Sequence, residues 1–289
     1  MARWQARGRS YRGAIMLLQG RAEFIEKYYE TVHDLLDRGY AIVTFDWRGQ
    51  GLSDRLNDDR TLDHIESLNQ RIEDLEYIRQ RHFDGKLKEP HYVVGHSMGA
   101  HIMLRHMLRH RGTFERYVAL SPMLGIAPVG IPESLIQWTV RTATSWGLGM
   151  RYMITQKPMR SRAERAAFGA RLTRDQARLE DTLRAVDENP DLHLGGTSIA
   201  WMHVAYQSCT ALLREAEENT QALPLMMLLA GDEMLVNNAK SQAFARSLPA
   251  QSCEVIDGAR HELLKETDDV RREVLGKIIR FFRSIEASQ

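Results

Sequence analysis

The chain has 289 residues, of which 43% are hydrophobic and 27% are charged. This balance is typical of a globular protein with a buried core and excludes a disordered chain or an integral membrane protein. The 39 Lys and Arg residues nearly cancel the 38 Asp and Glu residues and are spread along the chain, so nucleic acid is not an expected partner.

The start of the chain and its longest uncharged run predict neither export nor a membrane span. Residues 1–12 contain four arginines and no apolar stretch of the length that a secretory signal needs. The run 117–132 is too short to cross a bilayer and contains three prolines. Cys209 and Cys253 match no zinc or redox spacing, which favours reduced thiols. We expect a cytoplasmic protein; its Arg-rich start is compatible with peripheral contact at the inner face of a membrane.

Strand and helix patterns alternate along most of the chain. Short apolar runs predict buried strands at 14–18, 41–45, 92–94, 117–120, 225–229 and 253–256. Helical patterns lie between or after them at 25–38, 61–83, 100–111, 239–247 and 270–285. The alternation predicts an α/β fold with a mostly parallel, twisted sheet flanked by helices.

The alternation stops between Pro122 and about Leu223, where the pattern is helical without strand signals. This segment is too long for a connecting loop and predicts an inserted helical cap at 123–222, with core parts at 1–122 and 223–289. For the apolar residues of its first part we expect packing between cap and core, with a surface for acyl chains as the alternative. They are Met123, Leu124, Ile126, Ile131, Leu135, Ile136, Trp138, Trp146, Leu148, Met150 and Met153.

The motif Gly95-His96-Ser97-Met98-Gly99 follows the apolar run 92–94 and precedes a helical pattern from Ala100. This order of strand, G-x-S-x-G and helix is typical of a nucleophile elbow, whose two glycines allow a tight turn that exposes the serine hydroxyl. The motif alone arises by chance in many loops, so its context carries the interpretation. It predicts that Ser97 is the nucleophile of a serine hydrolase.

Such a serine needs a base, and His261 is our choice among 11 histidines because it follows the last predicted strand in a glycine-containing turn. A zinc-protease motif is excluded there, since Lys265 stands where the second histidine would be. His106 and His110 lie four apart on one helix, but the sequence suggests no third metal ligand, and an amphipathic helix explains them. We expect neither a metal nor a cofactor.

Two adjacent carboxylates, Asp232 and Glu233, follow the penultimate strand and are candidates for the acid that orients His261. Spacing favours Glu233, because the acid of this arrangement is usually followed, after one variable residue, by two apolar residues, here Leu235 and Val236. Residue type favours Asp232, and either carboxylate is chemically competent. We select Glu233 and keep Asp232 as the alternative.

The oxyanion of the reaction needs two backbone N–H donors. One is that of Met98, directly after the nucleophile, and the other comes from the loop after the third strand of an α/β-hydrolase sheet. Here that loop is Gln19-Gly20-Arg21-Ala22-Glu23, which follows the strand at 14–18, and by position the second donor is the N–H of Arg21.

Together these segments resemble the bacterial lysophospholipase and monoacylglycerol lipase family of α/β-hydrolases. The resemblance covers most of the chain and is carried by the loop 19–23, the elbow, the Asp-x-Arg-Gly-x-Gly-x-Ser motif at 46–53, Leu120 to Ile126, and Asn189-Pro190 with Gly195-Gly196. The loop at 19 often begins His-Gly in this family, and the acid is more often Asp. Both departures weaken the transfer of substrate identity.

The resemblance implies a carboxylic ester hydrolase that acts through an acyl-enzyme on a lysophospholipid or a monoacylglycerol. Two alternatives stay open: a short-chain carboxylesterase or peptidase of the same fold, and a catalytically silent hydrolase fold that only binds a ligand. The sequence leaves the acyl preference, the oligomeric state and the mobility of the cap undetermined.

Overall fold

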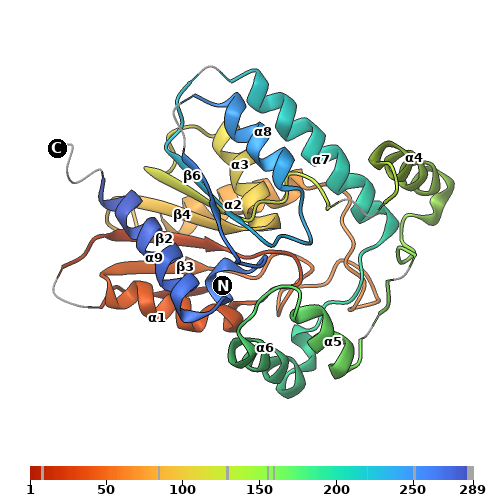
Figure 1. Ribbon diagram of the computed structural model, residues 1–289, viewed down its shortest axis with the longest axis horizontal. Coiled ribbons are helices and arrows are strands. Elements are labelled where there is room, and N and C mark those ends of the chain that lie inside the picture. Colours follow the sequence, from red (N-terminus) through yellow and green to blue (C-terminus); the bar gives the residue numbers. More distant parts are fainter. Residues whose placement is uncertain are drawn as a thin grey trace.

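The computed structural model describes residues 1–7, 10–83, 85–127, 130–154, 156–158, 160–219, 221–249 and 252–284. They form a seven-stranded sheet in the order β1-β3-β2-β4-β5-β6-β7, in which β1 is antiparallel to β3 and every other pair is parallel (Figure 1). The strands are β1 (Ala2–Trp4), β2 (Gly13–Leu18), β3 (Tyr40–Thr44), β4 (His91–His96), β5 (Arg116–Leu120), β6 (Leu225–Ala230) and β7 (Ser252–Ile256).

Helices cover both faces of the sheet, as expected for parallel strands joined by crossovers. On one face, η1 (Ile25–Tyr28), α1 (Tyr29–Asp37) and α9 (Asp268–Arg283) pack over side chains such as Ile15 and Val94. On the other, α2 (Asn69–His82), α3 (Met98–Arg109), α7 (Ile199–Glu217) and α8 (Asn238–Ser247) pack over Met16 and Val93. In the described part of the chain, no helix combines the length and the apolarity that a bilayer span requires.

The six predicted strands and the α/β class are confirmed, whereas one strand and the start of one helix differ clearly from the expectation. The edge strand β1 is too short for its alternation to be recognised in the sequence. Helix α2 begins at Asn69 and not at Thr61, because residues 61–68 form a loop that pairs with Thr197 through Asp63. The predicted end of the last helix, Ile285, lies outside the described residues.

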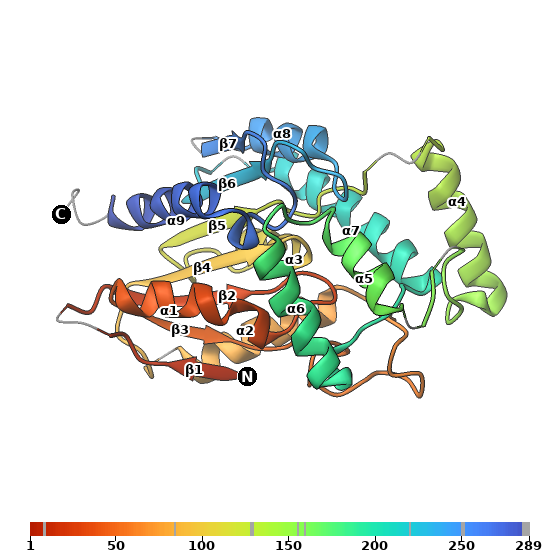
Figure 2. The same cartoon turned by 60° about the horizontal axis from the view of Figure 1, so that its bottom comes forward.

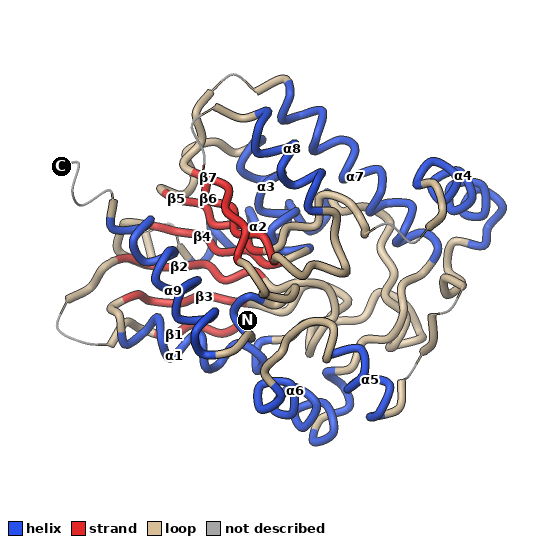
Figure 3. Tube along the Cα trace, in the orientation of Figure 1, coloured by secondary structure: helices blue, strands red, loops and turns tan. Residues whose placement is uncertain are grey.

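Between β5 and β6 the described residues contribute helices but no strand, only isolated bridges (Figure 3). The elements are α4 (Glu133–Ala143), the short π-helical turn η2 (Thr144–Leu148), α5 (Arg162–Gly169), α6 (Gln176–Glu188), η3 (Pro190–Leu192) and α7. Helices α4, α5 and α6 lie beyond the carboxyl ends of the strands, whereas Leu212 and Ala216 of α7 are buried in the core against α3 and α8 (Figure 2).

The apolar first part of this segment does not pack as the sequence predicts. Met123 and Leu124 are buried, but a group of large apolar side chains farther along is exposed. This exposed group is Ile131 (52%), Leu135 (51%), Trp138 (56%), Trp146 (76%), Leu148 (37%), Met150 (48%) and Ile154 (85%). An apolar pattern shows which face of a helix is apolar and cannot show whether a neighbour covers it. The prediction of cap-to-core packing is therefore wrong for these residues, except Ile154, which was not among the residues expected to pack.

The elbow depends on two glycines for close contact, not for positive φ. A Cβ on Gly95 would lie 2.7 Å from the Cα of Ala100, where α3 folds back over β4. A Cβ on Gly99 would lie 2.4 Å from the carbonyl oxygen of Gln19 and 2.6 Å from that of Leu18. The loop after β2 can therefore reach the first turn of α3 only if residue 99 has no side chain.

We expect Gly99→Ala to lower the free energy of unfolding by about 1–3 kcal/mol, because the added methyl group meets backbone oxygens that cannot rotate away. Gly276→Ala in α9 is the matched control, because its Cβ would meet only the flexible side chain of Arg280. This substitution should raise the free energy of unfolding by about 0.5–1 kcal/mol. Urea unfolding measures both. Equal effects of the two substitutions would contradict the close contact at Gly99.

Candidate active site

Ser97 occupies the turn between β4 and α3 with φ 51° and ψ −114°, a backbone conformation that few non-glycine residues adopt. Its amide donates to the carbonyl oxygen of Leu120 on the neighbouring strand at 2.9 Å. Its hydroxyl lies 3.0 Å from Nε2 of His261, which comes from the loop after β7. The structure therefore brings together two side chains that are far apart in the sequence.

The other ring nitrogen of His261, Nδ1, lies 2.8 Å from Oε2 of Glu233. The second oxygen of Glu233 accepts from the backbone N–H groups of Met234, Leu235 and Val236 at 3.0, 2.7 and 3.2 Å. Burial alone would raise the pKa of Glu233, but the bond to His261 and these N–H groups outweigh burial and lower it. The carboxylate stays charged and keeps the Nδ1–H of His261 facing it.

The carboxylate of Asp232 contacts a different partner from that of Glu233. Its carboxylate is half-exposed and pairs with the guanidinium of Arg174, while its amide donates to the carbonyl oxygen of Ala259 at 2.8 Å. Of the two adjacent carboxylates, Glu233 is therefore the one that contacts His261.

The two predicted oxyanion donors have free backbone N–H groups. Among the described residues, the amides of Arg21 and Met98 have no hydrogen-bond acceptor. Met98 is the first residue of α3, whose N-terminus carries partial positive charge. The loop with Arg21 lies against this turn, as the close approach of Gln19 to Gly99 requires.

Gln50 clamps the two peptide groups that flank Arg21. This fully buried side chain donates from Nε2 to the carbonyl oxygen of Gly20 at 3.0 Å and accepts at Oε1 from the amide of Ala22 at 3.3 Å. C=O and N–H point in opposite directions across a trans peptide bond. Holding the carbonyl of Gly20 toward Gln50 therefore aims the N–H of Arg21 away from Gln50. Ala22 has φ 58°, a strained conformation that this clamp helps to hold.

A buried carboxylate, Glu23, links this loop to His261. Its Oε2 accepts from the amide of Gly20 at 2.5 Å and lies 3.0 Å from Nδ1 of His96, while its Oε1 accepts from Lys27 at 2.8 Å. Nε2 of His96 lies 3.1 Å from the carbonyl oxygen of His261. Carboxylates and carbonyls only accept, so both nitrogens of His96 carry protons. Burial opposes this charge, but Glu23 outweighs it and raises the pKa of His96.

Sequence reasoning missed these supporting roles. Glu23, Gln50 and His96 each lie inside a segment that carried the family resemblance, so a signal was present. The partners of Gln50 and His96 are at least 28 residues away along the chain, and His96 and Glu23 are 73 residues apart, so only the packed structure shows these contacts.

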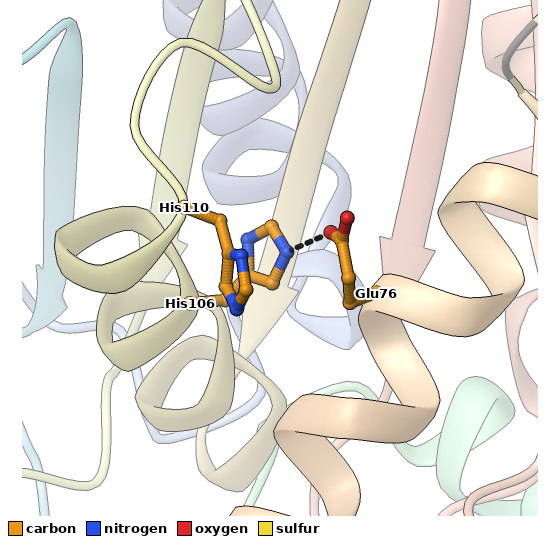
Figure 4. A group of neighbouring side chains, drawn as sticks. All are labelled: Glu76, His106 and His110. Atoms are coloured by element: carbon orange, nitrogen blue, oxygen red, sulfur yellow. Dashed lines mark hydrogen bonds and ion pairs between the residues drawn. The ribbon is translucent and has the colours of Figure 1, made fainter.

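His106 of α3 and His110, the residue that follows this helix, lie beside Glu76 of α2 (Figure 4). The structure thus supplies the third group that the sequence did not suggest. The two rings stack with an interplanar angle of 26°, Nε2 of His106 lies 2.7 Å from Oε2 of Glu76, and Glu76 is also held by Arg79 at 2.9 and 2.8 Å. Arg79 lowers the pKa of Glu76 to about 2, and burial lowers that of His106 to about 4. This arrangement is a hydrogen-bonded helix contact, and we assign no metal to it.

The chain is similar to known proteins in sequence and in fold. The profile of the family described as serine aminopeptidase, S33, matches residues 9–268. The chain belongs to this family. Its members are α/β-hydrolases, and the sheet order, the elbow and the helical segment between β5 and β6 agree with that membership. The chain is accordingly a hydrolase of this family.

Several proteins of similar sequence or fold are named as lipid hydrolases. The chain is 28% identical to lysophospholipase L2 of Escherichia coli over 281 residues, which cover 93% of this chain and 79% of that protein. It is 24% identical to phospholipase YtpA of Bacillus subtilis, with 93% of each chain covered. A monoglyceride lipase from Saccharomyces cerevisiae shares the fold with a TM-score of 0.75 at 19% identity, covering 98% of this chain and 90% of that one.

We expect Gln50→Met to lower kcat for ester hydrolysis about 10²-fold with little change in KM, because the peptide that presents the Arg21 N–H loses its anchor. Affinity for a boronic acid that mimics the tetrahedral intermediate should fall in parallel. Gln80→Met, at an exposed glutamine bonded to Glu76, is the control. A folded Gln50 variant with normal kcat and normal inhibitor affinity would refute this role.

Proposed function

We propose that the protein is a serine esterase that cleaves a single-chain lipid ester, a lysophospholipid or a monoacylglycerol, through an acyl-enzyme on Ser97. The observation that carries the proposal is the continuous hydrogen-bonded chain Ser97 Oγ, His261 Nε2, His261 Nδ1 and Glu233 Oε2, at 3.0 and 2.8 Å. This chain lies beside two unpaired backbone donors, in a fold whose related proteins are named as lipases.

In the proposed reaction, His261 Nε2 takes the hydroxyl proton of Ser97 while Oγ bonds to the ester carbonyl carbon. The carbonyl oxygen becomes an oxyanion and accepts from the N–H groups of Arg21 and Met98. His261 then returns the proton to the departing alcohol as the C–O bond breaks, and Glu233 stabilises the imidazolium. Water attacks the acyl-enzyme by the same steps and releases the fatty acid, which regenerates Ser97.

We propose that residues 123–222 act as a cap over this site, inserted between core parts 1–122 and 223–289. The loop after α5 supports this role, because the carbonyl oxygen of Leu172 accepts from the amide of Glu262, next to His261, at 2.9 Å. The exposed apolar group on α4 and η2 suits contact with a lipid surface, since Trp138 and Trp146 are side chains that favour the membrane interface. Arg141 and Arg151 beside them suit anionic headgroups.

We expect Ser97→Ala to lower kcat about 10⁴- to 10⁶-fold and to abolish labelling by a fluorophosphonate. Glu233→Gln should cost about 10⁴-fold, because His261 loses the charge that orients it. Asp232→Asn is the matched control and should cost less than about twofold, since its carboxylate faces Arg174. Hydrolysis of an ester panel measures all three. Equal losses at 232 and 233 would contradict the choice of acid, and full activity of Ser97→Ala would overturn the mechanism.

We expect the double variant Trp138→Ala and Trp146→Ala to bind phospholipid vesicles at least about 10-fold more weakly, because each exposed indole loses its apolar contact with the interface. Sedimentation with vesicles measures this binding. Tyr77→Ala, an equally exposed aromatic on α2, is the control and should bind as the wild type does. Normal vesicle binding by the double variant would exclude this docking surface.

The family description names aminopeptidases, so peptides are the second candidate substrate. A panel of acyl esters of increasing chain length and amino-terminal peptide amides separates the two functions. Activity that rises with acyl length supports the lipase proposal. Activity confined to peptides or to two- to four-carbon esters would replace it.

A further inference from the structure

Two arginines at the ends of α5 share one aromatic ring and have no carboxylate of their own. The guanidinium carbons of Arg160 and Arg171 lie 4.7 and 5.9 Å from the centre of the Phe168 ring. Among the described residues neither arginine forms a salt bridge, since the nearby Glu164 pairs with Lys157 at 2.8 Å. The two guanidiniums therefore have no salt-bridge partner in the described part of the chain, and at Arg160 the charge of Glu164 opposes those of Arg21 and Arg171.

The side chain of Arg21 extends from the proposed oxyanion loop toward the same region. Its Nη1 donates to the carbonyl oxygen of Gly195 at 3.2 Å and lies 3.3 Å from Oδ2 of the buried Asp63. Asp63 also faces the buried Arg71 at 3.7 Å, so one carboxylate serves two cations. The amide of Gly196 donates to the carbonyl oxygen of Lys157 at 3.0 Å, which joins this region to the segment that leads to Arg160.

Burial and neighbouring cations lower the pKa values of two groups in this region. Burial, and then the charges of Arg21 and Arg171, lower the pKa of Arg160. Burial, followed by Arg165, Arg160 and Arg21, lowers the pKa of His193, whose Nε2 is buried without a hydrogen-bond partner. Adjacent cations that form no salt bridge with a described residue favour the binding of an anion.

Two backbone connections join this cluster to the proposed chemistry. The loop after α5 carries Arg171 and bonds the residue next to His261 through the carbonyl oxygen of Leu172. Arg21 provides the proposed oxyanion donor from its backbone and a cation from its side chain. The path from the backbone nitrogen of an arginine to its guanidinium carbon contains a certain number of covalent bonds. The path from the ester carbonyl carbon of a 1-acyl lysophospholipid to its phosphorus contains the same number.

We propose that Arg21, Arg160 and Arg171 form a subsite for the phosphate of a lysophospholipid, which makes this lipid, and not the uncharged monoacylglycerol, the preferred substrate. The inference rests on the proposed esterase function and refines its substrate class. Guanidinium groups bind phosphate oxygens through strong, charge-assisted hydrogen bonds. The same cations would repel the α-ammonium group that an aminopeptidase must bind, so the cluster also counts against a peptide substrate.

The test compares kcat/KM for a 1-acyl lysophospholipid and a 1-monoacylglycerol of the same acyl chain, both below their critical micelle concentrations. The ratio of the two values should fall about tenfold in Arg160→Gln and in Arg171→Gln, and further in the double variant. Arg162→Gln is the matched control in α5, the helix that Arg160 and Arg171 flank, because its guanidinium already pairs with Asp187 and Glu180. Its ratio should equal that of the wild type.

Three results would overturn the subsite. An unchanged ratio in an active double variant would show that the arginines do not read the phosphate. Inhibition of the wild type by inorganic phosphate that weakens in the double variant without a change in the ratio would assign the cluster to free phosphate. Hydrolysis of neither lipid by the wild type would overturn the proposed function and this subsite with it, whereas the first two results leave the esterase function standing.

Discussion

The buried carboxylate of Glu23 is the interaction on which the geometry around Ser97 depends. A desolvated carboxylate must satisfy both oxygens, and Glu23 does so with the amide of Gly20, the ring of His96 and the ammonium of Lys27. These groups belong to the loop after β2, the end of β4 and η1. Because His96 also bonds the carbonyl oxygen of His261, one charge ties together the loops on both sides of Ser97. Lys27 and His96 hold the pKa of Glu23 well below its usual value against the effect of burial, so the tie persists at neutral pH.

The surrounding structure restrains the backbone and leaves a few polar groups free. Ser97 and Ala22 have φ of 51° and 58°, conformations that persist because strand pairing and the Gln50 clamp over-determine them. The amides of Arg21 and Met98 stay unpaired among the described residues, although their neighbours are bonded. The helical segment beyond the strands differs from this centre. It exposes apolar side chains, and its Arg160 and Arg171 form no salt bridge with a described residue. Such a division suits a rigid centre for chemistry below a surface that recognises a lipid.

Much of the architecture could be predicted because its signals are local. Apolar runs gave the six longer strands, and the elbow motif gave the turn at Ser97. What failed depended on distant partners: residues 61–68 form a loop because Asp63 pairs with Thr197, and the apolar face of α4 stays exposed because none of the described segments covers it. The roles of Gln50 and His96 escaped detection for the same reason, since their motifs were recognised but their contacts lie across the fold.

The sequence by itself determined the order of strands and helices, the turn that presents Ser97 and the types of residue available to act with it, because these follow from spacing along the chain. It left two carboxylates, Asp232 and Glu233, for one position. Tertiary structure decided between them, as the amides of residues 234–236 turn Glu233 toward His261 while Arg174 draws Asp232 outward. It also brought Arg160 and Arg171 to the ring of Phe168 and placed Arg160 close enough to Arg21 for their charges to interact, since charges far apart in sequence become neighbours only when the chain packs.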